Sequence, residues 1–197
     1  MTKVAAGSAV LLCTFGLLAG CAHTAYVRGV AGADAGEPPP QGGSICIALH
    51  PEGPESELDG EITEKIGRLL VRKGFALTHS SEADYFLFFE FERKSLMTRV
   101  RLEPLGGVRT GIHTTHQEGP FDLTLSLRLV EAGLYHEKGL EEFVWVGGAV
   151  LSEVPTESPK FVDLLLVAAM KQFPKDTGAT LKTRIGLYDS DAKRLRR

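Results

Sequence analysis

The stretch from Phe121 to Glu131, FDLTLSLRLVE, alternates apolar and polar residues along its whole length. Successive side chains of a β-strand point to opposite faces of a sheet, so this period of two predicts a strand that is buried on one side only. A strand of this kind needs neighbouring strands and a covering layer, which constrains the chain to an architecture built on a half-buried sheet. The residues predicted to face the core are Phe121, Leu123, Leu125, Leu127 and Leu129.

Residues 56–74, SELDGEITEKIGRLLVRKG, repeat apolar residues with the period of a helix that is buried along one side. Ser56 is followed three residues later by Asp59, a spacing that resembles a capping box. Acidic residues crowd the first turns and basic residues the last, and Gly74 is a typical stop. We therefore predict a helix whose buried stripe consists of Leu58, Ile62, Ile66, Leu69 and Leu70.

A second helix is predicted towards the carboxyl end of the chain. Ser158 is suited to cap it, and Pro159 takes the first helical position, where a missing N–H costs nothing. Pro174 ends the helix because its ring cannot continue the backbone hydrogen-bonding pattern. The residues predicted to form its buried stripe are Phe161, Leu164, Leu165, Ala168 and Phe173.

Four further segments are rich in β-branched and aromatic residues and are predicted to be strands. They are residues 44–50, 75–79, 85–94 and 141–154, the last with an expected bulge at Gly147–Gly148. The order of elements is then β–α–β–β–β–β–α. This order indicates the α+β class, with a mainly antiparallel sheet of about five strands and two helices on one face, in a domain spanning residues 44–174.

The connection between Lys94 and Pro120 is unusually long for a compact domain. Within it, MTRVRLE alternates between apolar and polar residues, as a strand does. We interpret the segment as the two arms of a hairpin that meet near Gly106–Gly107, with a disordered loop as the alternative.

The amino terminus has the features of a secretory signal over residues 1–20: Lys3, then a charge-free apolar run shorter than a membrane span. The sequence LAGC that ends at Cys21 resembles the lipobox of bacterial lipoproteins. This resemblance implies cleavage before Cys21, a diacylglycerol on its thiol and an acyl chain on its amino group. Ala22, in place of an aspartate, implies the periplasmic face of the outer membrane. The alternatives are an uncleaved anchor and an ordinary signal with a chance cysteine.

Two segments flanking the domain are predicted to lack regular packing. Residues 21–43 are dominated by Gly, Ala and Pro, and we expect a flexible tether with a reach of about 25 Å. Residues 175–197 are expected to form a basic, partly disordered tail. Its bases are possible contacts for anionic lipid headgroups, with a solvated tail as the alternative; they are Lys193, Arg194, Arg196 and Arg197.

Charge argues against a nucleic-acid-binding surface, and cysteine content argues against an intrachain disulfide. Lys3 is the only charged residue of the signal, so 21 basic and 25 acidic residues remain after its removal, which argues against a nucleic-acid surface over the domain. Cys13 leaves with the signal and Cys21 carries lipid. Only Cys46 remains, so no intrachain disulfide forms, and we expect Cys46 to act as a small buried hydrophobic residue.

Several short motifs between Ile45 and Pro174 resemble a family of uncharacterised bacterial outer-membrane lipoproteins with a small α+β domain of unknown function. They are KGF at residues 73–75, AD at residues 83–84, Trp145 with Gly147, and FP at residues 173–174. The resemblance implies a fold and a compartment, and it carries over no catalytic residue.

The sequence contains no nucleophile elbow, phosphate loop, dinucleotide motif or calcium loop. His113 and His116 form HTTH, followed by Glu118, and are the candidates for a metal site, which needs further ligands. We favour solvent-facing loop histidines, with no metal and no cofactor beyond the lipid. Trp145 is predicted to fill the core rather than to form a binding platform.

These observations favour a lipid-anchored, non-catalytic protein of the cell envelope that acts as a binding or assembly module. Its expected partners are the membrane, through the anchor, and either envelope proteins or cell-wall polymer. One alternative is a metal-dependent hydrolase that uses His113 and His116. The other is a carrier of an apolar ligand, suggested by YFLFFEF at residues 85–91.

Overall fold

The computed structural model describes residues 22–32, 42–53, 56–96, 98–104, 112–118, 120–155 and 158–196, with 98–104 and 112–118 as backbone. The predicted signal, Cys21 and Arg197 lie outside these ranges. The elements are β1 (Ala22–Ala31), β2 (Ser44–Leu49), α1 (Asp59–Arg72), β3 (Ala76–Leu77), η2 (Ser80–Glu82), β4 (Tyr85–Ser95), β5 (Thr98–Pro104), β6 (Ile112–Glu118), β7 (Phe121–Glu131), α2 (Ala132–Lys138), β8 (Trp145–Val154), α3 (Pro159–Gln172), β9 (Leu181–Gly186) and α4 (Ser190–Leu195).

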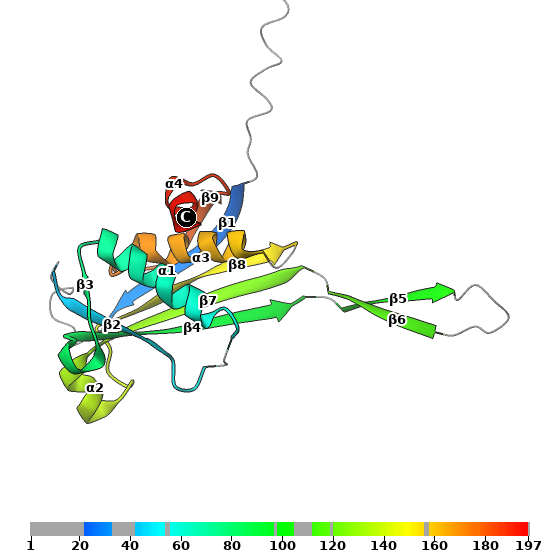
Figure 1. Cartoon of the computed structure of the whole chain (residues 1–197). Coiled ribbons are helices and arrows are strands. Elements are labelled where there is room, and N and C mark those ends of the chain that lie inside the picture. Colours follow the sequence, from blue (N-terminus) through cyan, green and yellow to red (C-terminus); the bar gives the residue numbers. More distant parts are fainter. Residues whose placement is uncertain are drawn as a thin grey trace, which may run out of the picture.

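The fold is α+β, as predicted, but the described sheet is larger than expected. It has seven strands in the order β3-β2-β4-β7-β8-β1-β9 (Figure 1). The sheet is also mixed: β2 runs parallel to β3 and β4, and the other pairs are antiparallel. The parallel pairs arise because α1 lies between β2 and the next two strands, and a helical crossover returns the chain in the same direction.

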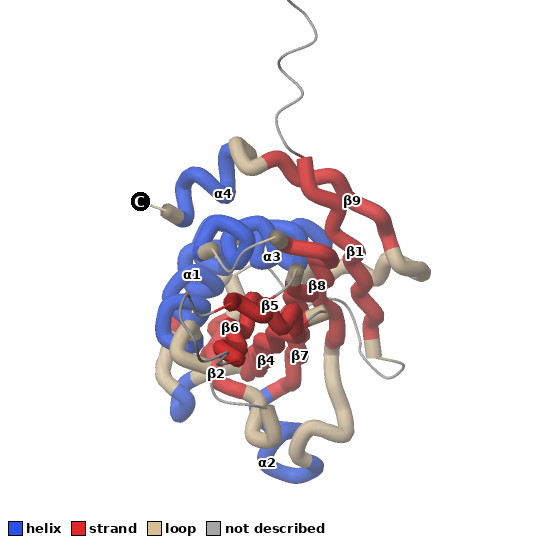
Figure 2. Tube along the Cα trace, turned by 90° about the vertical axis from the view of Figure 1, so that its right-hand side faces the viewer, coloured by secondary structure: helices blue, strands red, loops and turns tan. Residues whose placement is uncertain are grey.

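Helices lie on both faces of the sheet, not on one face only. α1 and α3 cover one face, α4 packs on α3, and the short helix α2 lies at one end of the opposite face (Figures 1 and 2). Residues 132–138 form α2, a helix that the sequence analysis did not identify. Tyr135 of this helix packs on Phe86 and Phe88, with ring centroids 5.2 and 5.0 Å apart. The apolar residues on the second side of β4 therefore have a cover of their own.

The predicted end of α1 and the predicted limits of α3 are confirmed, whereas α1 begins at Asp59, with Leu58 rather than Ser56 as its N-cap residue. The Ser56 N–H donates to the Asp59 carboxylate (2.8 Å), and the Leu58 N–H donates to Ser56 Oγ (3.2 Å). At the other end of α1, Gly74 has a positive φ of 89°, which L-residues with a side chain rarely adopt. In α3, Ser158 Oγ accepts from the Lys160 N–H, and the helix ends just before Phe173.

The predicted tether over residues 21–43 is wrong for its first part, which is strand β1. Ala25 and Val27 are buried, and the strand pairs with β8 and β9 on its two sides. The small residues that suggested a tether have a packing role. A Cβ at Gly29 would lie 2.9 Å from Nε1 of the Trp145 indole, so only glycine fits there. Residues 33–41, with the three prolines, lie outside the described part of the chain.

The prediction of a partly disordered tail is also wrong, because residues 181–195 form β9 and α4. Ile185, Ala192 and Leu195 are buried against α3. All residues of α3 from Phe161 to Met170 are buried, and a helix that is apolar all round needs cover on every side. Figure 2 shows β8, β1 and β9 curving round α3 on one side, with α4 on another. The tail is ordered because it completes this cover.

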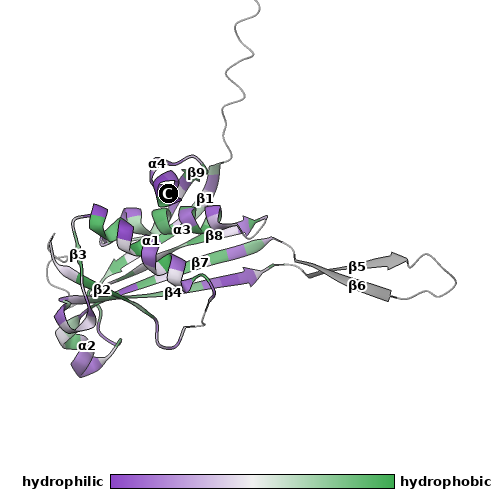
Figure 3. Cartoon of the chain, in the orientation of Figure 1, coloured by the Kyte–Doolittle hydropathy of each residue, from purple (hydrophilic) through white to green (hydrophobic). Residues whose placement is uncertain are grey.

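The segment between Lys94 and Pro120 contains a hairpin, as predicted, formed by β5 and β6. It continues the β4–β7 pair in the same register. Lys94 pairs with Asp122 and Thr98 with Glu118, and between them the Leu96 N–H donates to the Pro120 carbonyl (2.9 Å). β4–β5 and β6–β7 are thus one long ribbon whose outer part projects from the body (Figure 1). Figure 3 shows β4 becoming hydrophilic towards the projecting end.

The expected bulge at Gly147–Gly148 is absent. These residues pair regularly with Leu127 and Ser126, and the register shift lies further along β8, where Glu153 has a φ of 56°. The glycines are required for another reason. A Cβ at Gly147 would lie 2.4 Å from the ring of Trp145, which lies across this position.

The start of the parallel pair β2–β4 is held by one carboxylate. Asp84 Oδ2 accepts from the N–H of Ser44 (2.8 Å) and from its hydroxyl (2.7 Å), and these bonds hold the pKa of Asp84 below its ordinary value. A carboxyl group with a depressed folded-state pKa stabilises the fold above its unfolded pKa of about 4. That contribution is lost as the pH falls through the depressed value.

Replacement of Asp84 by Asn is therefore expected to lower the Tm at pH 7 and to reduce the further loss of Tm between pH 7 and pH 3. Ser44→Ala, which removes one of the two hydrogen bonds, is expected to have an intermediate effect. Thermal unfolding at both pH values measures this. An unchanged acid dependence in Asp84→Asn would show that the carboxylate does not link β2 to β4 in the way described.

Candidate binding face on the open side of the sheet

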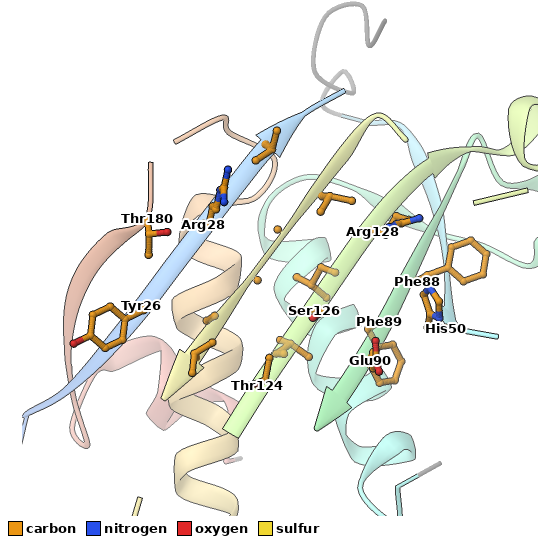
Figure 4. Close-up of a pocket in the computed structure, with 18 residues that line it drawn as sticks. Tyr26, Arg28, His50, Phe88, Phe89, Glu90, Thr124, Ser126, Arg128 and Thr180 are labelled. Atoms are coloured by element: carbon orange, nitrogen blue, oxygen red, sulfur yellow. The ribbon is translucent and has the colours of Figure 1, made fainter. Parts of the chain in front are cut away.

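A hollow lies on the sheet face opposite α1 and α3. It has a volume of about 520 Å³ and extends over β1, β8, β7 and β4 (Figure 4). Its polar and charged lining comes from Tyr26, Arg28, His50, Glu90, Thr124, Ser126, Arg128 and Thr180. The hollow is wide and open to solvent, so it presents a surface rather than an enclosed chamber.

Strand register explains which side chains meet on this face. Residues directly opposite in an antiparallel pair lie on the same face. Arg28 is opposite Gly148, Gly148 is opposite Ser126, and Ser126 is opposite Glu90, so these four positions form a row across the four strands. The alternation of β7 predicted Thr124, Ser126 and Arg128 to face solvent, and they line this hollow.

Gly148 makes the centre of the face low. A Cβ at this position would lie 2.0 Å from the Leu125 carbonyl oxygen, so no side chain fits. Ser126, opposite Gly148 on β7, has only a short hydroxymethyl side chain. Bare backbone and small side chains thus form a floor between the larger side chains of β1 and those of β4.

Apolar and charged side chains both line the face. Val30, Val146, Val150 and Phe88 contribute to the lining, while Figure 4 shows Arg28 and Glu90 at opposite sides of the hollow. The guanidinium group of Arg128 is held in place. It donates to the Leu140 carbonyl (2.6 Å) and lies over the ring of Phe143, 5.7 Å from the centroid.

The two histidines of the proposed metal site are residues of β6, opposite Glu103 and Val100 in the hairpin. Positions 113 and 116 are three apart on a strand, so they fall on opposite faces of the two-stranded ribbon. Among the side chains that the structure describes, no three His, Cys, Asp or Glu residues form a group suited to a metal ion. The metal role of His113 and His116 stays a prediction.

The basic residues of the tail have differing environments. Arg196 Nε lies 3.0 Å from the carboxylate of Asp163, and its guanidinium also donates to the Leu187 carbonyl, so it is held within the fold. Lys193 lies over the ring of Tyr188, 5.0 Å from the centroid, and Arg194 is 4.0 Å from Asp191. Contact of Lys193, Arg194 and Arg197 with lipid headgroups stays a prediction. The ion pair of Arg196 with Asp163 argues against a headgroup contact of Arg196.

Asp163 is a residue that the sequence analysis missed. Its side chain is 0% exposed, and its two oxygens lie 2.5 Å from Lys65 Nζ and 3.0 Å from Arg196 Nε. Burial lowers the pKa of Lys65, but hydrogen bonds and the charges of Asp163 and Glu61 outweigh this effect and raise it. The cluster joins α1, α3 and α4. A single acid within the apolar run FVDLLLVAAM was the signal for it.

Two further predictions concern buried residues. Trp145 is 1% exposed, packs edge-on against Phe173 with centroids 5.0 Å apart, and donates its indole N–H to the Lys175 carbonyl (3.0 Å). It is a core residue, as predicted. Cys46 is half-buried, and its desolvation raises the pKa of the thiol, which disfavours the reactive thiolate.

No protein-family model matches the chain, and no curated protein sequence matches it. Among solved structures it is similar to a PDZ domain protein from Parabacteroides distasonis (10% identity, TM-score 0.46), covering 84% of this chain and 40% of that one. A dodecamer of a PelC variant from Paraburkholderia phytofirmans has 14% identity and a TM-score of 0.43, covering 76% and 96%. A DUF4136 family protein from Bacteroides thetaiotaomicron has 13% identity and a TM-score of 0.39, covering 75% and 92%.

The chain thus spans less than half the length of the Parabacteroides protein. The DUF4136 family neighbour is an uncharacterised bacterial domain, as are the proteins that the sequence motifs resemble. All three TM-scores are below 0.5, so these likenesses carry no argument about function. Separately, none of the described helices is both long and apolar enough to span a bilayer.

Proposed function

We propose that this chain is a lipid-anchored, non-catalytic protein of the cell envelope that binds another envelope protein through the open face of its sheet. The anchor is Cys21, on the resemblance of LAGC to a lipobox, and the compartment is the periplasmic face of the outer membrane. The observation that supports a binding role is the uncovered hollow over β1, β8, β7 and β4.

The composition of this face favours a protein partner over cell-wall polymer. Protein interfaces have an apolar centre and a polar margin, and they are enriched in Tyr and Arg. Here valines and Phe88 occupy the hollow, with Tyr26, Arg28 and Arg128 among them. Tyr26 is 42% exposed, so an aromatic ring is available to be buried by a partner.

The two alternatives gain no comparable support. A carrier of an apolar ligand requires space between the helices and the sheet, and that layer is filled by fully buried side chains such as Trp145, Phe89 and Phe173. A metal-dependent hydrolase requires His113 and His116 to act together, and the strand places their positions on opposite faces of the ribbon.

The binding role is tested by filling the hollow. Ser126→Arg places a long cationic side chain beside Arg28 and Arg128, and we expect recovery of the partner to fall about tenfold or more. The measurement is crosslinking of the anchored protein in intact cells, followed by quantitative mass spectrometry of what is recovered with it.

Ser81→Arg is the matched control, because Ser81 is exposed in η2, away from the open face. It is expected to leave recovery of the partner unchanged, and thermal unfolding verifies that both variants are folded. Equal recovery from the two variants would contradict a partner site on the open face.

A further inference from the structure

The proposed anchor is joined to the folded body without a linker. Ala22, the residue after Cys21, is the first residue of β1 and is opposite Gly186 of β9. Adjacent Cα atoms are about 3.8 Å apart, so acyl chains on Cys21 begin within a few ångströms of the sheet. A tether of about 25 Å would have let the body float away from the bilayer. A lipid attached directly to a strand keeps the body close to the bilayer.

The surface around this point has an exposed aromatic residue. Tyr188 follows Gly186 by two residues and is therefore close to the start of β1. Its side chain is 71% exposed, and Lys193 of α4 lies over its ring. Tyrosine is enriched where proteins meet the boundary between water and lipid, because its ring is apolar and its hydroxyl group is polar.

Basic residues accompany Tyr188. Lys193 and Arg194 belong to α4, and both bases are exposed. We call Tyr188, Lys193 and Arg194 the α4 rim.

The nearby acids are partly neutralised. Asp189 is paired with Lys171 (3.0 Å) and Asp191 lies 4.0 Å from Arg194, while Glu153 is exposed at the end of β8. The rim is therefore more basic than the chain as a whole, whose formal charge is −3.

We propose that the α4 rim lies on the surface of an anionic bilayer and fixes the orientation of the body relative to the membrane. This inference rests on the proposed lipid anchor at Cys21. Figure 1 shows α4 beyond α3 on the helical side of the sheet, and α2 on the other side. With the rim on the bilayer, the open face is turned away from the membrane and is accessible to a partner in the periplasm.

Depth-dependent fluorescence quenching tests this orientation. The acylated full-length protein is reconstituted into vesicles of phosphatidylethanolamine and phosphatidylglycerol that carry brominated acyl chains. We expect the added indole of a Tyr188→Trp variant to be quenched and its emission shifted to the blue. Leu77→Trp is the matched control, because Leu77 is also exposed but lies in β3, at the opposite edge of the sheet. The buried Trp145 is common to all variants, and the unsubstituted protein gives its signal.

Charge reversal at Lys193 and Arg194 supplies a second test. In the Tyr188→Trp background we expect Lys193→Glu with Arg194→Glu to weaken the quenching. A base near an anionic surface contributes about 1 kcal/mol, which is roughly a fivefold preference for the surface. Vesicles of phosphatidylcholine alone are expected to weaken the quenching in the same way.

The outcomes separate this inference from the proposed function. If the protein is acylated and vesicle-bound but the Tyr188→Trp indole is not quenched, or the Leu77→Trp indole is quenched equally, the orientation is overturned and the anchor stands. If the intact mass shows no acyl chains and the protein does not float with vesicles, the anchor itself is wrong. Quenching confined to the Tyr188→Trp variant supports both.

Discussion

Replacing Asp163 by alanine is expected to lower the free energy of unfolding by about 3–5 kcal/mol. The carboxylate is fully buried and is the partner of both Lys65 and Arg196. Without it, the ammonium group of Lys65 stays buried at the α1–α3 contact with only the more exposed Glu61 as its partner. Removal of one member of a buried ion cluster leaves a charge uncompensated, which is among the costliest single changes in a core. Urea denaturation of the protein lacking residues 1–21 measures the effect.

Two controls show whether charge is the cause. Asp163→Asn preserves shape and is expected to cost nearly as much as Asp163→Ala, because it also removes the charge. Asp163→Leu combined with Lys65→Met and Arg196→Met is expected to regain most of the stability, since apolar groups often replace a buried ion cluster without loss. A loss below about 1 kcal/mol in Asp163→Ala would show that the cluster does not hold α1, α3 and α4 together.

Replacing Trp145 by alanine is expected to cost about 3–5 kcal/mol. The indole lies across two glycines, Gly29 of β1 and Gly147 of β8, and against Phe173. Truncation leaves a cavity lined by backbone that no neighbouring side chain fills, and it removes the hydrogen bond to the Lys175 carbonyl. Equilibrium denaturation measures the loss.

Trp145→Phe is the graded control. It keeps a ring over the glycines but removes the N–H donor and part of the volume, so its cost is expected to lie well below that of Trp145→Ala. Gly147→Ala, which inserts a methyl group into the space of the indole, is expected to destabilise as well. Equal costs for Trp145→Phe and Trp145→Ala would contradict a core packed around this ring.

The sequence predicted correctly those features that depend on residues close to one another along the chain. The alternation of β7 identified its buried and solvent-facing sides, and Gly74 and Ser158 marked the limits of helices, because caps and strand faces are local properties. The hairpin of β5 and β6 was inferred on the same basis.

The missed elements depend on partners distant in sequence. β1 looked like a tether because Gly29 and its small neighbours leave room for Trp145, more than 100 residues away. β9 and α4 looked like a tail because their burial depends on α3 being apolar all round. The open face was missed for the same reason, because its β1 side, with Tyr26 and Arg28, lies in the segment that was predicted to be a tether.

The proposed membrane placement rests on acylation of Cys21, and metabolic labelling with an alkyne-bearing fatty acid tests this acylation directly. We expect the unsubstituted protein and a Cys46→Ser variant to be labelled, the Cys21→Ser variant to be unlabelled, and the intact mass of the mature protein to correspond to a chain that begins at Cys21 with diacylglycerol and an acyl chain. An unlabelled protein, or equal labelling of the Cys21→Ser variant, would contradict the lipid anchor and the membrane placement that rests on it.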